Sequence, residues 1–401
     1  MKAQTYRYII VGAGLAGASA VDGIRTQDRE GTILLIGDEP HPPYNRPPLS
    51  KKLWFGKTTV EKIFLHPPAY YTEQHVELIT GVAIIGIDAA AHTVTDARGL
   101  TYGYEKLLLA TGGTPRRLAI PGGDLDGISY YRSLRDFETL HPQATEGKSA
   151  LIIGGGFIGT EIAAALRINK LAVTMLYPDE TLVSRVFPAD LGHALQEVYR
   201  AKGVRLITGD TAVAITRRGD QYVTQTRNGA ELTSDLLIVG IGIAPALELA
   251  RLAGVETGNG IEVNAFLQTA DHDIYAAGDV AHFPYQALGQ RLRIEHWDNA
   301  LNQGAAAGRN MAVAADPYTY MPYFFSDLFE FGYEAVGDVS TKLLTIADWQ
   351  TPYDTGVIYY MQDNRVRGVM MCNLWDKVDA ARALIRANEP VNPDDLRGRL
   401  S

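Results

Sequence analysis

Two stretches of the chain, about 140 residues apart, share one order of apolar and polar positions. Each begins with a short apolar run, at 6–11 and at 149–153, that is typical of a buried strand. A glycine turn, an alanine-rich run and a second apolar run (32–36 and 172–177) follow in both stretches. The pattern predicts two β–turn–α–β units with parallel strands, and therefore an α/β fold.

Both glycine turns have the spacing G-x-G-x-x-G. A turn of this kind between a strand and a helix brings backbone N–H groups and the helix N-terminus to a pyrophosphate. One such turn is not specific, but two in one chain indicate two bound dinucleotides that exchange electrons. The first turn comprises Gly12, Ala13, Gly14, Leu15, Ala16 and Gly17, and the second runs from Gly154 to Gly159 through Gly156, Phe157 and Ile158.

The remaining pattern indicates that one nucleotide-binding domain is split by the other. After strands through 76–110, the second unit closes with a strand that turns at Gly242, and the chain returns with a strand near 274 and a helix at about 297–313. We therefore predict two Rossmann-like dinucleotide-binding domains, at 1–115 with 245–318 and at 116–244, and a C-terminal domain at 319–401.

Two other segments have distinctive patterns. Residues 41–48 are too proline-rich for a helix or a central strand, and Ser50 is expected to cap a short helix that carries Lys51. In the C-terminal domain, apolar runs flank Asp363 and Asn364 and predict a hairpin, a helix is expected near 375–388, and the last residues resemble a loose polar tail. This domain is predicted to be α+β.

Composition limits the classes of function. The chain has 401 residues, 46% of them hydrophobic and 21% charged, as in ordinary globular enzymes. A net charge of −9 argues against nucleic acid or an anionic membrane as the partner. Its single cysteine, Cys372, allows no intramolecular disulfide, and the nine histidines lack metal-ligand spacing. We therefore predict no metal and a reducing, cytoplasmic setting.

Acidic residues follow the second strand of each unit, where the ribose of a dinucleotide is bound. Asp38 stands 21 residues after Gly17 and is followed by Glu39, while Asp179 stands 20 residues after Gly159. The alternative for both sites is a solvated acidic turn. An acid at position 179 favours NADH, because it accepts a hydrogen bond from the free 2′-hydroxyl and repels a 2′-phosphate. Arg185 could still reach such a phosphate.

Longer runs resemble those of the two-dinucleotide flavoprotein reductases, in the branch of ferredoxin and rubredoxin reductases and, within it, the apoptosis-inducing factor type. They keep the family's order over nearly the whole chain. The matching runs are PYNRPPLSK at 43–51, LWF at 53–55, YEK at 104–106, ATGGTPR at 110–116, GGGFIG at 154–159 with Glu161, AGD at 277–279, EH at 295–296 and GYEA at 332–335.

The resemblance implies FAD in the first unit and NADH in the second. By motif match, FAD contacts fall on the first glycine turn and on Asp38, Glu39, Arg46, Lys51, Val82, Arg132, Asp279, His296 and Trp297. NADH contacts fall on Gly156, Phe157, Ile158, Glu161, Asp179, Arg185, Gly242 and Glu334.

Several of these residues have a specific expected role. The family's ion pair beside flavin N5 maps onto Lys51 and Glu161, which the sequence alone would equally allow as two surface charges. Asp279 is expected to accept from a ribityl hydroxyl, or else to cap a helix. His296 is expected to precede a helix whose positive end faces the flavin, and not to act as a general base.

The chain departs from the family's pattern at two sites beside the flavin. Phe325 replaces the tryptophan of a W-S-D-L run, which keeps a π face and removes the indole N–H. The family's E-H-H-D run appears here as Glu295, His296, Trp297 and Asp298. The first departure changes how a reduced flavin–nicotinamide complex is held.

The resemblance implies an NADH oxidoreductase in which hydride passes to flavin N5 and electrons then leave singly. The expected acceptor is a small ferredoxin or rubredoxin, or an artificial acceptor. The alternative is a redox sensor or scaffold with slow turnover and a long-lived reduced complex. The pattern leaves the oligomeric state open, a homodimer included. Disulfide reductases and flavin peroxidases of this fold are excluded, because residues 46–50 hold no cysteine.

Overall fold

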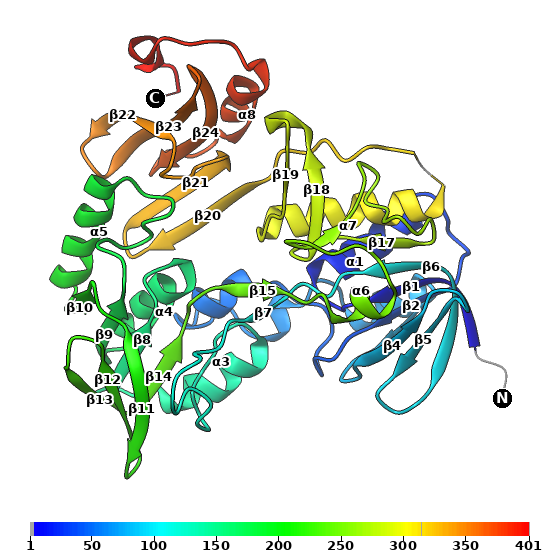
Figure 1. Cartoon of the computed structure of the whole chain (residues 1–401), viewed down its shortest axis with the longest axis horizontal. Helices are drawn as coiled ribbons and strands as arrows, with labels where there is room; N and C mark the ends of the chain where they lie inside the picture. The colour runs from blue at the N-terminus through cyan, green and yellow to red at the C-terminus, as the bar shows by residue number, and fades with distance from the viewer. Residues whose placement is uncertain (1–3, 314, 401) are drawn as a thin grey trace. The chain divides into compact units, whose positions relative to one another are not determined.

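The computed structural model describes residues 4–313 and 315–400 (Figure 1). The chain divides into two compact units, and each is made of three segments. The first unit comprises Met1–Asn45, Glu61–Thr114 and Ala244–Tyr323, and the second comprises Arg46–Val60, Pro115–Ile243 and Phe324–Ser401. The division into three domains with the predicted boundaries stays a prediction.

The first unit is built on a seven-stranded sheet in the order β3-β2-β1-β6-β5-β4, with β17 paired to β6. Its central strands are parallel, and their C-terminal parts (Tyr8–Val11, Ile33–Ile36 and Leu107–Leu109) are apolar and buried, as expected for the interior of a parallel sheet. Helices α1 and α7 pack so closely that a Cβ at Gly304 would lie 2.2 Å from the Ala16 carbonyl. The unit contains β1 (Gln4–Val11), α1 (Leu15–Arg25), β2 (Ile33–Ile36), η2 (Glu61–Ile63), α2 (Pro68–Glu73), β3 (Val76–Ile79), β4 (Ile84–Asp88), β5 (Thr93–Asp96), β6 (Thr101–Leu109), α6 (Glu248–Leu252), β16 (Ile261–Glu262), β17 (Ile274–Ala276), β18 (Ala281–Tyr285), η4 (Gln286–Leu288), β19 (Gln290–Leu292) and α7 (Trp297–Ala312).

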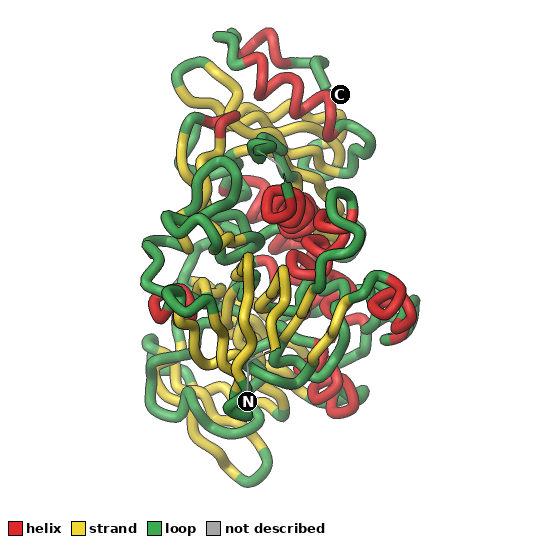
Figure 2. The backbone as a smooth tube through the Cα atoms, turned by 90° about the vertical axis from the view of Figure 1, so that its right-hand side faces the viewer, coloured by secondary structure: helices red, strands yellow, loops and turns green. Residues whose placement is uncertain are grey.

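The second unit combines a parallel sheet, β10-β9-β8-β14, with the antiparallel sheets β11-β12-β13 and β20-β21-β24-β23-β22. The helices and strands of each unit can be followed in Figure 2, where helices are red and strands are yellow. Strands β7 (Gly113–Pro115) and β15 (Ile243–Pro245) lie where the chain passes between units. The unit contains η1 (Pro47–Ser50), α3 (Leu134–Leu140), η3 (His141–Gln143), β8 (Ser149–Ile153), α4 (Phe157–Ile168), β9 (Ala172–Tyr177), α5 (Ala189–Ala201), β10 (Arg205–Thr208), β11 (Ala212–Arg218), β12 (Gln221–Thr226), β13 (Glu231–Ser234), β14 (Leu236–Val239), β20 (Tyr323–Leu328), β21 (Phe331–Gly337), β22 (Leu344–Thr351), β23 (Thr355–Gln362), β24 (Arg365–Cys372), α8 (Val378–Ala387) and η5 (Pro393–Leu396).

The α/β fold class is confirmed, and so is the hairpin around Asp363 and Asn364, both of which have positive φ. The predicted loose polar tail is wrong. A short 3₁₀ helix forms near the C-terminus, and Leu396 and Leu400 are both buried. Two leucines among eight or so polar residues are enough to anchor the segment, because each buried leucine contributes about 2 kcal/mol.

Candidate functional site

The first glycine turn joins β1 to α1 in a cradle that no side chain fills. Gly12 has φ +111°, and a Cβ there would lie 2.2 Å from the Ala110 carbonyl oxygen. A Cβ at Gly14, the N-cap of α1, would meet nothing within 4 Å. Because the Ala110 carbonyl comes so close, only glycine fits at position 12. The space beside Gly14, at the N-terminus of α1, is open. This geometry fits a pyrophosphate.

Two predicted ribose acids and Val82 are brought together beside this turn. The Val82 N–H donates to the Gly37 carbonyl at 2.9 Å, and the Gly81 N–H donates to the Glu39 carbonyl at 2.8 Å. The Tyr44 hydroxyl donates to the Glu39 carboxylate at 2.6 Å, whereas Asp38 is exposed. Asp38 is thus the acid available to a ligand. Its hydrogen bond to a ribose stays a prediction.

Asp279, His296 and Trp297 meet at the N-terminus of α7. His296 is the N-cap and Trp297 the first helical residue, so the helix begins where the sequence pattern predicts. Burial lowers the pKa of His296 to about 4, and the Asp279 carboxylate acts in the opposite direction. His296 is therefore neutral at pH 7. The Trp297 indole donates to Asn45 at 2.8 Å, and Glu295 forms an ion pair with Arg293 at 2.5 Å.

The second glycine turn joins β8 to α4 in the second unit with the same geometry. A Cβ at Gly156 would meet nothing within 4 Å, and Phe157 and Ile158 are each 38% exposed. Asp179 follows β9 and is exposed, as the spacing predicts. The segment that carries Arg185 reaches this turn, because the Val183 N–H donates to the Gly155 carbonyl at 2.8 Å.

Lys51 and Glu161 form the buried ion pair that the resemblance implies. Their Nζ and Oε1 atoms are 3.2 Å apart, and the two side chains are 11% and 10% exposed. The Lys51 ammonium also lies 4.8 Å from the centre of the Phe325 ring. Two charges are held out of water here, and such pairs require further hydrogen bonds to be stable.

Two serine hydroxyls provide those hydrogen bonds. Ser50 donates to Oε2 of Glu161 and Ser326 donates to Oε1, each at 2.5 Å. Burial raises the pKa of Tyr199 and Tyr333 well above the usual phenol value, and the Glu161 carboxylate adds to both shifts. The Glu161 carboxyl group thus has the Lys51 ammonium and two hydroxyl donors as its immediate neighbours.

The prediction that Ser50 caps a helix is wrong. Pro47 and Pro48 instead start a 3₁₀ turn, η1, in which Ser50 is the last residue and Lys51 the C-cap. The Ser50 hydroxyl is therefore directed to Glu161. Sequence reasoning did not identify Ser50 or Ser326 as site residues, although each is adjacent to one that it did identify.

Four other predicted residues belong to the second unit and have contacts of their own. Arg46 donates to the Arg132 carbonyl at 3.0 Å, so that these two predicted FAD contacts are neighbours. Gly242 has φ +96° and accepts from the Arg116 N–H at 2.9 Å. Burial raises the pKa of Glu334, and the Asp376 carboxylate adds to the shift. Ligand contacts of all four stay predictions.

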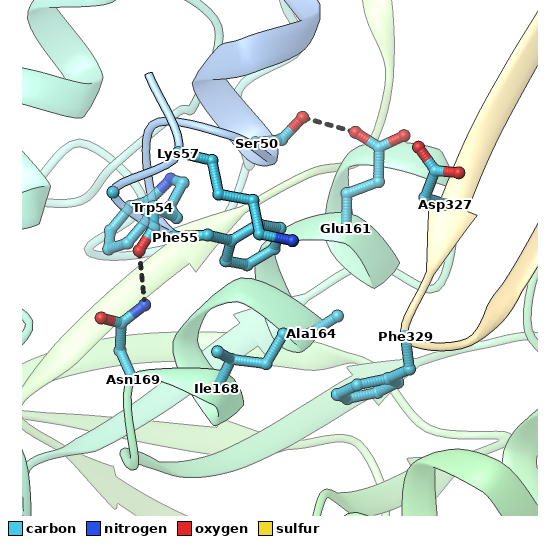
Figure 3. Close-up of a pocket in the computed structure, with 11 residues that line it drawn as sticks. Ser50, Trp54, Phe55, Lys57, Glu161, Ala164, Ile168, Asn169, Asp327 and Phe329 are labelled. Carbon is cyan, nitrogen blue, oxygen red and sulfur yellow. Dashed lines mark hydrogen bonds between the residues drawn. The ribbon is translucent and has the colours of Figure 1, made fainter. Parts of the chain in front are cut away.

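A pocket of about 580 Å³ opens beside the ion pair (Figure 3). Ser50 and Glu161 line its buried end, and aromatic side chains of the 54–57 segment and of Phe329 form part of its walls. Among residues 4–313 and 315–400, no helix is long and apolar enough to cross a membrane, and no cluster of three or more His, Cys, Asp or Glu residues could hold a metal.

Residues 6–304 match the family described as pyridine nucleotide-disulphide oxidoreductase. The chain belongs to this family. Its members use FAD and NAD(P)H, and so does this chain, whose two open glycine cradles fit two dinucleotides. The disulphide chemistry in the family's name does not apply here, because Cys372 is the only cysteine. Burial raises the pKa of its thiol far above the usual range, which makes it unreactive.

Characterised relatives place the chain among reductases of the ferredoxin reductase type. It is 33% identical to putidaredoxin reductase of Pseudomonas putida over 97% of this chain and 93% of that protein. It is 33% identical to monodehydroascorbate reductase 3 of Arabidopsis thaliana (92% and 89% covered) and to apoptosis-inducing factor 1 of Dictyostelium discoideum (95% and 78%). The crystal structure of a covalent putidaredoxin reductase–putidaredoxin complex matches with a TM-score of 0.92 at 32% identity, over 98% of this chain and 95% of that chain.

Proposed function

We propose that this oxidoreductase takes electrons from NADH and passes them singly to a small carrier protein of the ferredoxin or rubredoxin class. The observation that carries the proposal is the buried Lys51–Glu161 pair, whose glutamate lies on α4 two residues after the second glycine turn. Putidaredoxin reductase and its complex with putidaredoxin support a protein acceptor. The lack of a cysteine pair supports an outward transfer of electrons that uses no protein dithiol.

Each unit would hold one dinucleotide. Residues Gly12–Gly17 with Asp38 and Asp279 would hold FAD, and residues Gly154–Gly159 with Asp179 would hold NADH. When bound, the flavin supplies the chemistry, since it accepts a hydride and releases electrons one at a time. Lys51 and Glu161 would set the charge around the acceptor atom, and the hydrogen bonds of Ser50 and Ser326 to Glu161 would hold that carboxyl group in place.

The preference for NADH rests on the charge beside the ribose. Asp179 is exposed at the end of β9, and residues 177–182 contain no lysine or arginine. A 2′-phosphate there would meet the Asp179 carboxylate, which disfavours NADPH, and the next basic residue along the chain is Arg185.

The test is anaerobic reduction of the purified FAD-loaded protein with NADH, followed by timing of reoxidation with and without a ferredoxin. We expect rapid reduction, and rapid reoxidation only when the carrier is present. A reduced state that persists with ferredoxin, rubredoxin and oxygen would exclude the reductase function.

The second candidate function is that of a redox sensor or scaffold. It is supported by the 33% identity to apoptosis-inducing factor 1 over 95% of the chain. It predicts a long-lived charge-transfer band after NADH addition and a change of oligomeric state on reduction. Turnover that is fast only with monodehydroascorbate, an organic radical, would instead align the chain with the Arabidopsis relative. The cytoplasmic setting and a homodimer stay predictions.

A further inference from the structure

The pocket beside Glu161 connects solvent to a buried carboxylate. At its buried end lie Ser50, Glu161 and Ala164, which are 4%, 8% and 3% exposed. At its rim lie Lys57, Ile168 and Asp327, all of them exposed. In Figure 3 the Asp327 carboxylate lies beside that of Glu161, and the Lys57 ammonium lies over the Phe55 ring. A cavity of about 580 Å³ with several polar groups on its walls is roomy and polar enough to hold water.

This pocket reaches Glu161 from the side away from the second glycine turn. Of the residues of α4, it is lined by Glu161, Ala164 and Ile168, which follow one helix face toward the C-terminus. The described residues that line it include none of the Gly154–Gly159 turn. The pocket is therefore separate from the cradle that fits the nicotinamide dinucleotide. Through it, Glu161 also faces a second space that water can enter.

The stoichiometry of the proposed function, on which this inference rests, requires a route for a proton. NADH and two oxidised one-electron carriers give NAD⁺, two reduced carriers and one H⁺. The hydride of NADH amounts to one proton and two electrons, and the carriers take only the electrons. One proton per NADH must therefore reach solvent from the protein interior.

We infer that the pocket is the water-filled route by which this proton passes from Glu161 to solvent. Glu161 takes up the proton that is left when the two electrons depart, and it then gives this proton to pocket water directly or through Ser50. The Ser50 hydroxyl has lone pairs to accept a proton while it passes its own to water. Ser50 is the relay because it contacts both the carboxylate and the pocket, whereas Ser326 contacts Glu161 but does not line the pocket.

Other titratable groups face Glu161 from the elements around it. Lys51 lies at 3.2 Å, and the phenols of Tyr199 on α5 and Tyr333 on β21 are close enough for the carboxylate to affect their pKa values. Both phenols are fully buried, so neither leads to solvent. Only the pocket side, with Lys57 and Asp327 at its rim, offers exposed groups among the described residues that line it.

The decisive experiment closes and widens the rim at one position. Ile168→Trp should fill the opening and Ile168→Ala should enlarge it, and Leu252→Trp, at an exposed apolar position of the other unit, is the matched control. Proton release is followed with a pH-indicator dye while ferricyanide, which takes only electrons, reoxidises the reduced protein. We expect release to slow about tenfold in Ile168→Trp and a solvent isotope effect to appear on turnover, because proton transfer becomes rate-limiting. Leu252→Trp and Ile168→Ala should release protons at the wild-type rate.

A second readout does not depend on turnover. In the resting protein, a water-soluble carbodiimide with an amine nucleophile labels accessible carboxylates, and mass spectrometry reports the fraction of Glu161 labelled. Labelling should fall in Ile168→Trp and rise in Ile168→Ala. If NADH fails to reduce the wild type, the proposed function is wrong. If electron transfer proceeds but proton release and labelling are unchanged in both Ile168 variants, this inference is wrong.

The two serines provide a matched pair for the relay. Ser50→Ala and Ser326→Ala each remove one hydrogen bond from Glu161, so their common effect reports the loss of that bond. Only Ser50→Ala should add a solvent isotope effect, and Ser50→Thr should remove it again by restoring the hydroxyl. Equal isotope effects in the two alanine variants would exclude the relay role of Ser50.

Discussion

The two glycine turns have the same backbone but different surroundings. Gly14 and Gly156 are N-caps with φ of −93° and −86°, and a Cβ at Gly12 or Gly154 would lie 2.2 or 2.3 Å from the carbonyl oxygen of the residue that follows a neighbouring strand. The local sequence thus produces the same cradle twice. What lies around each cradle differs, because the tertiary packing of each unit differs.

The first turn is the more enclosed of the two, because its residues 12–15 are half-buried whereas residues 156–158 of the second turn are exposed. In the first unit, α7 packs against α1 so tightly that Ala16 is 7% exposed. In the second unit, Gly156, Phe157 and Ile158 are all exposed. An enclosed site suits a resident cofactor and an open site suits a co-substrate that must enter and leave in every cycle. The following predictions test this assignment, from the largest expected effect to the smallest.

Valine in place of the middle glycine of each turn should have different effects in the two cradles. Since a Cβ at Gly14 or Gly156 meets nothing within 4 Å, Gly14→Val and Gly156→Val should fold normally and fill only the ligand space. Gly14→Val should lose FAD and all activity. Gly156→Val should keep FAD and raise KM for NADH about 100-fold, or about 2.7 kcal/mol. FAD content and steady-state kinetics measure the two effects.

The control for these variants is Gly86→Val, in β4, where a Cβ has room at 3.7 Å from Thr95. It should change neither FAD content nor KM. If Gly156→Val lost FAD and Gly14→Val kept it, the assignment of the two turns would be reversed.

Breaking the ion pair should slow flavin reduction without releasing FAD. Lys51→Met and Glu161→Gln should each reduce the rate about 100-fold, the lower end of what a positioned acid or base contributes. Lys51→Met should also lower the free energy of unfolding by about 3 kcal/mol, because it leaves a buried carboxylate without its cation. Anaerobic stopped-flow and urea unfolding measure these changes.

Lys170→Met is the control, since the Lys170–Glu146 pair is 68% and 70% exposed and should contribute almost nothing. Wild-type reduction rates in both Lys51→Met and Glu161→Gln would show that the pair has no part in hydride transfer.

The sequence predicted the strands and turns well, because parallel strands buried on both faces must be apolar throughout. Strands β8 and β9 begin and end where the apolar runs do. The hydrogen-bond partners of Glu161 could not be predicted from the sequence in the same way. Ser50 and Ser326 are 276 residues apart in the chain, and no local pattern shows that both hydroxyls reach one carboxylate. The sequence alone left a Lys51–Glu161 ion pair and two surface charges equally open, and the resemblance favoured the pair.

The acids after the second strands should differ in which ligand they select. Asp179→Ala should reduce the preference for NADH over NADPH about tenfold, or about 1.4 kcal/mol, because it removes both the hydrogen bond to the 2′-hydroxyl and the repulsion of a 2′-phosphate. Asp38→Ala should weaken FAD binding and leave the preference unchanged. The ratio of kcat/KM for the two nucleotides measures this. If Asp38→Ala changed the ratio and Asp179→Ala did not, the ribose of NADH would lie in the first unit.

The smallest effect concerns the exposed apolar side chains at the open cradle. Phe157 is 38% exposed, and its ring centre lies 5.7 Å from that of Phe324, which leaves one edge for a ligand. Phe157→Ala should raise KM for NADH about threefold, equivalent to about 25 Å² of apolar contact at the usual 25 cal/mol per Å². Leu15→Ala, at the equivalent position of the enclosed cradle, should leave KM unchanged and lower the temperature at which FAD dissociates. Because FAD is retained throughout the catalytic cycle, a change there affects thermal release and not turnover. A threefold rise in KM from Leu15→Ala with none from Phe157→Ala would show that the open cradle is not where NADH enters.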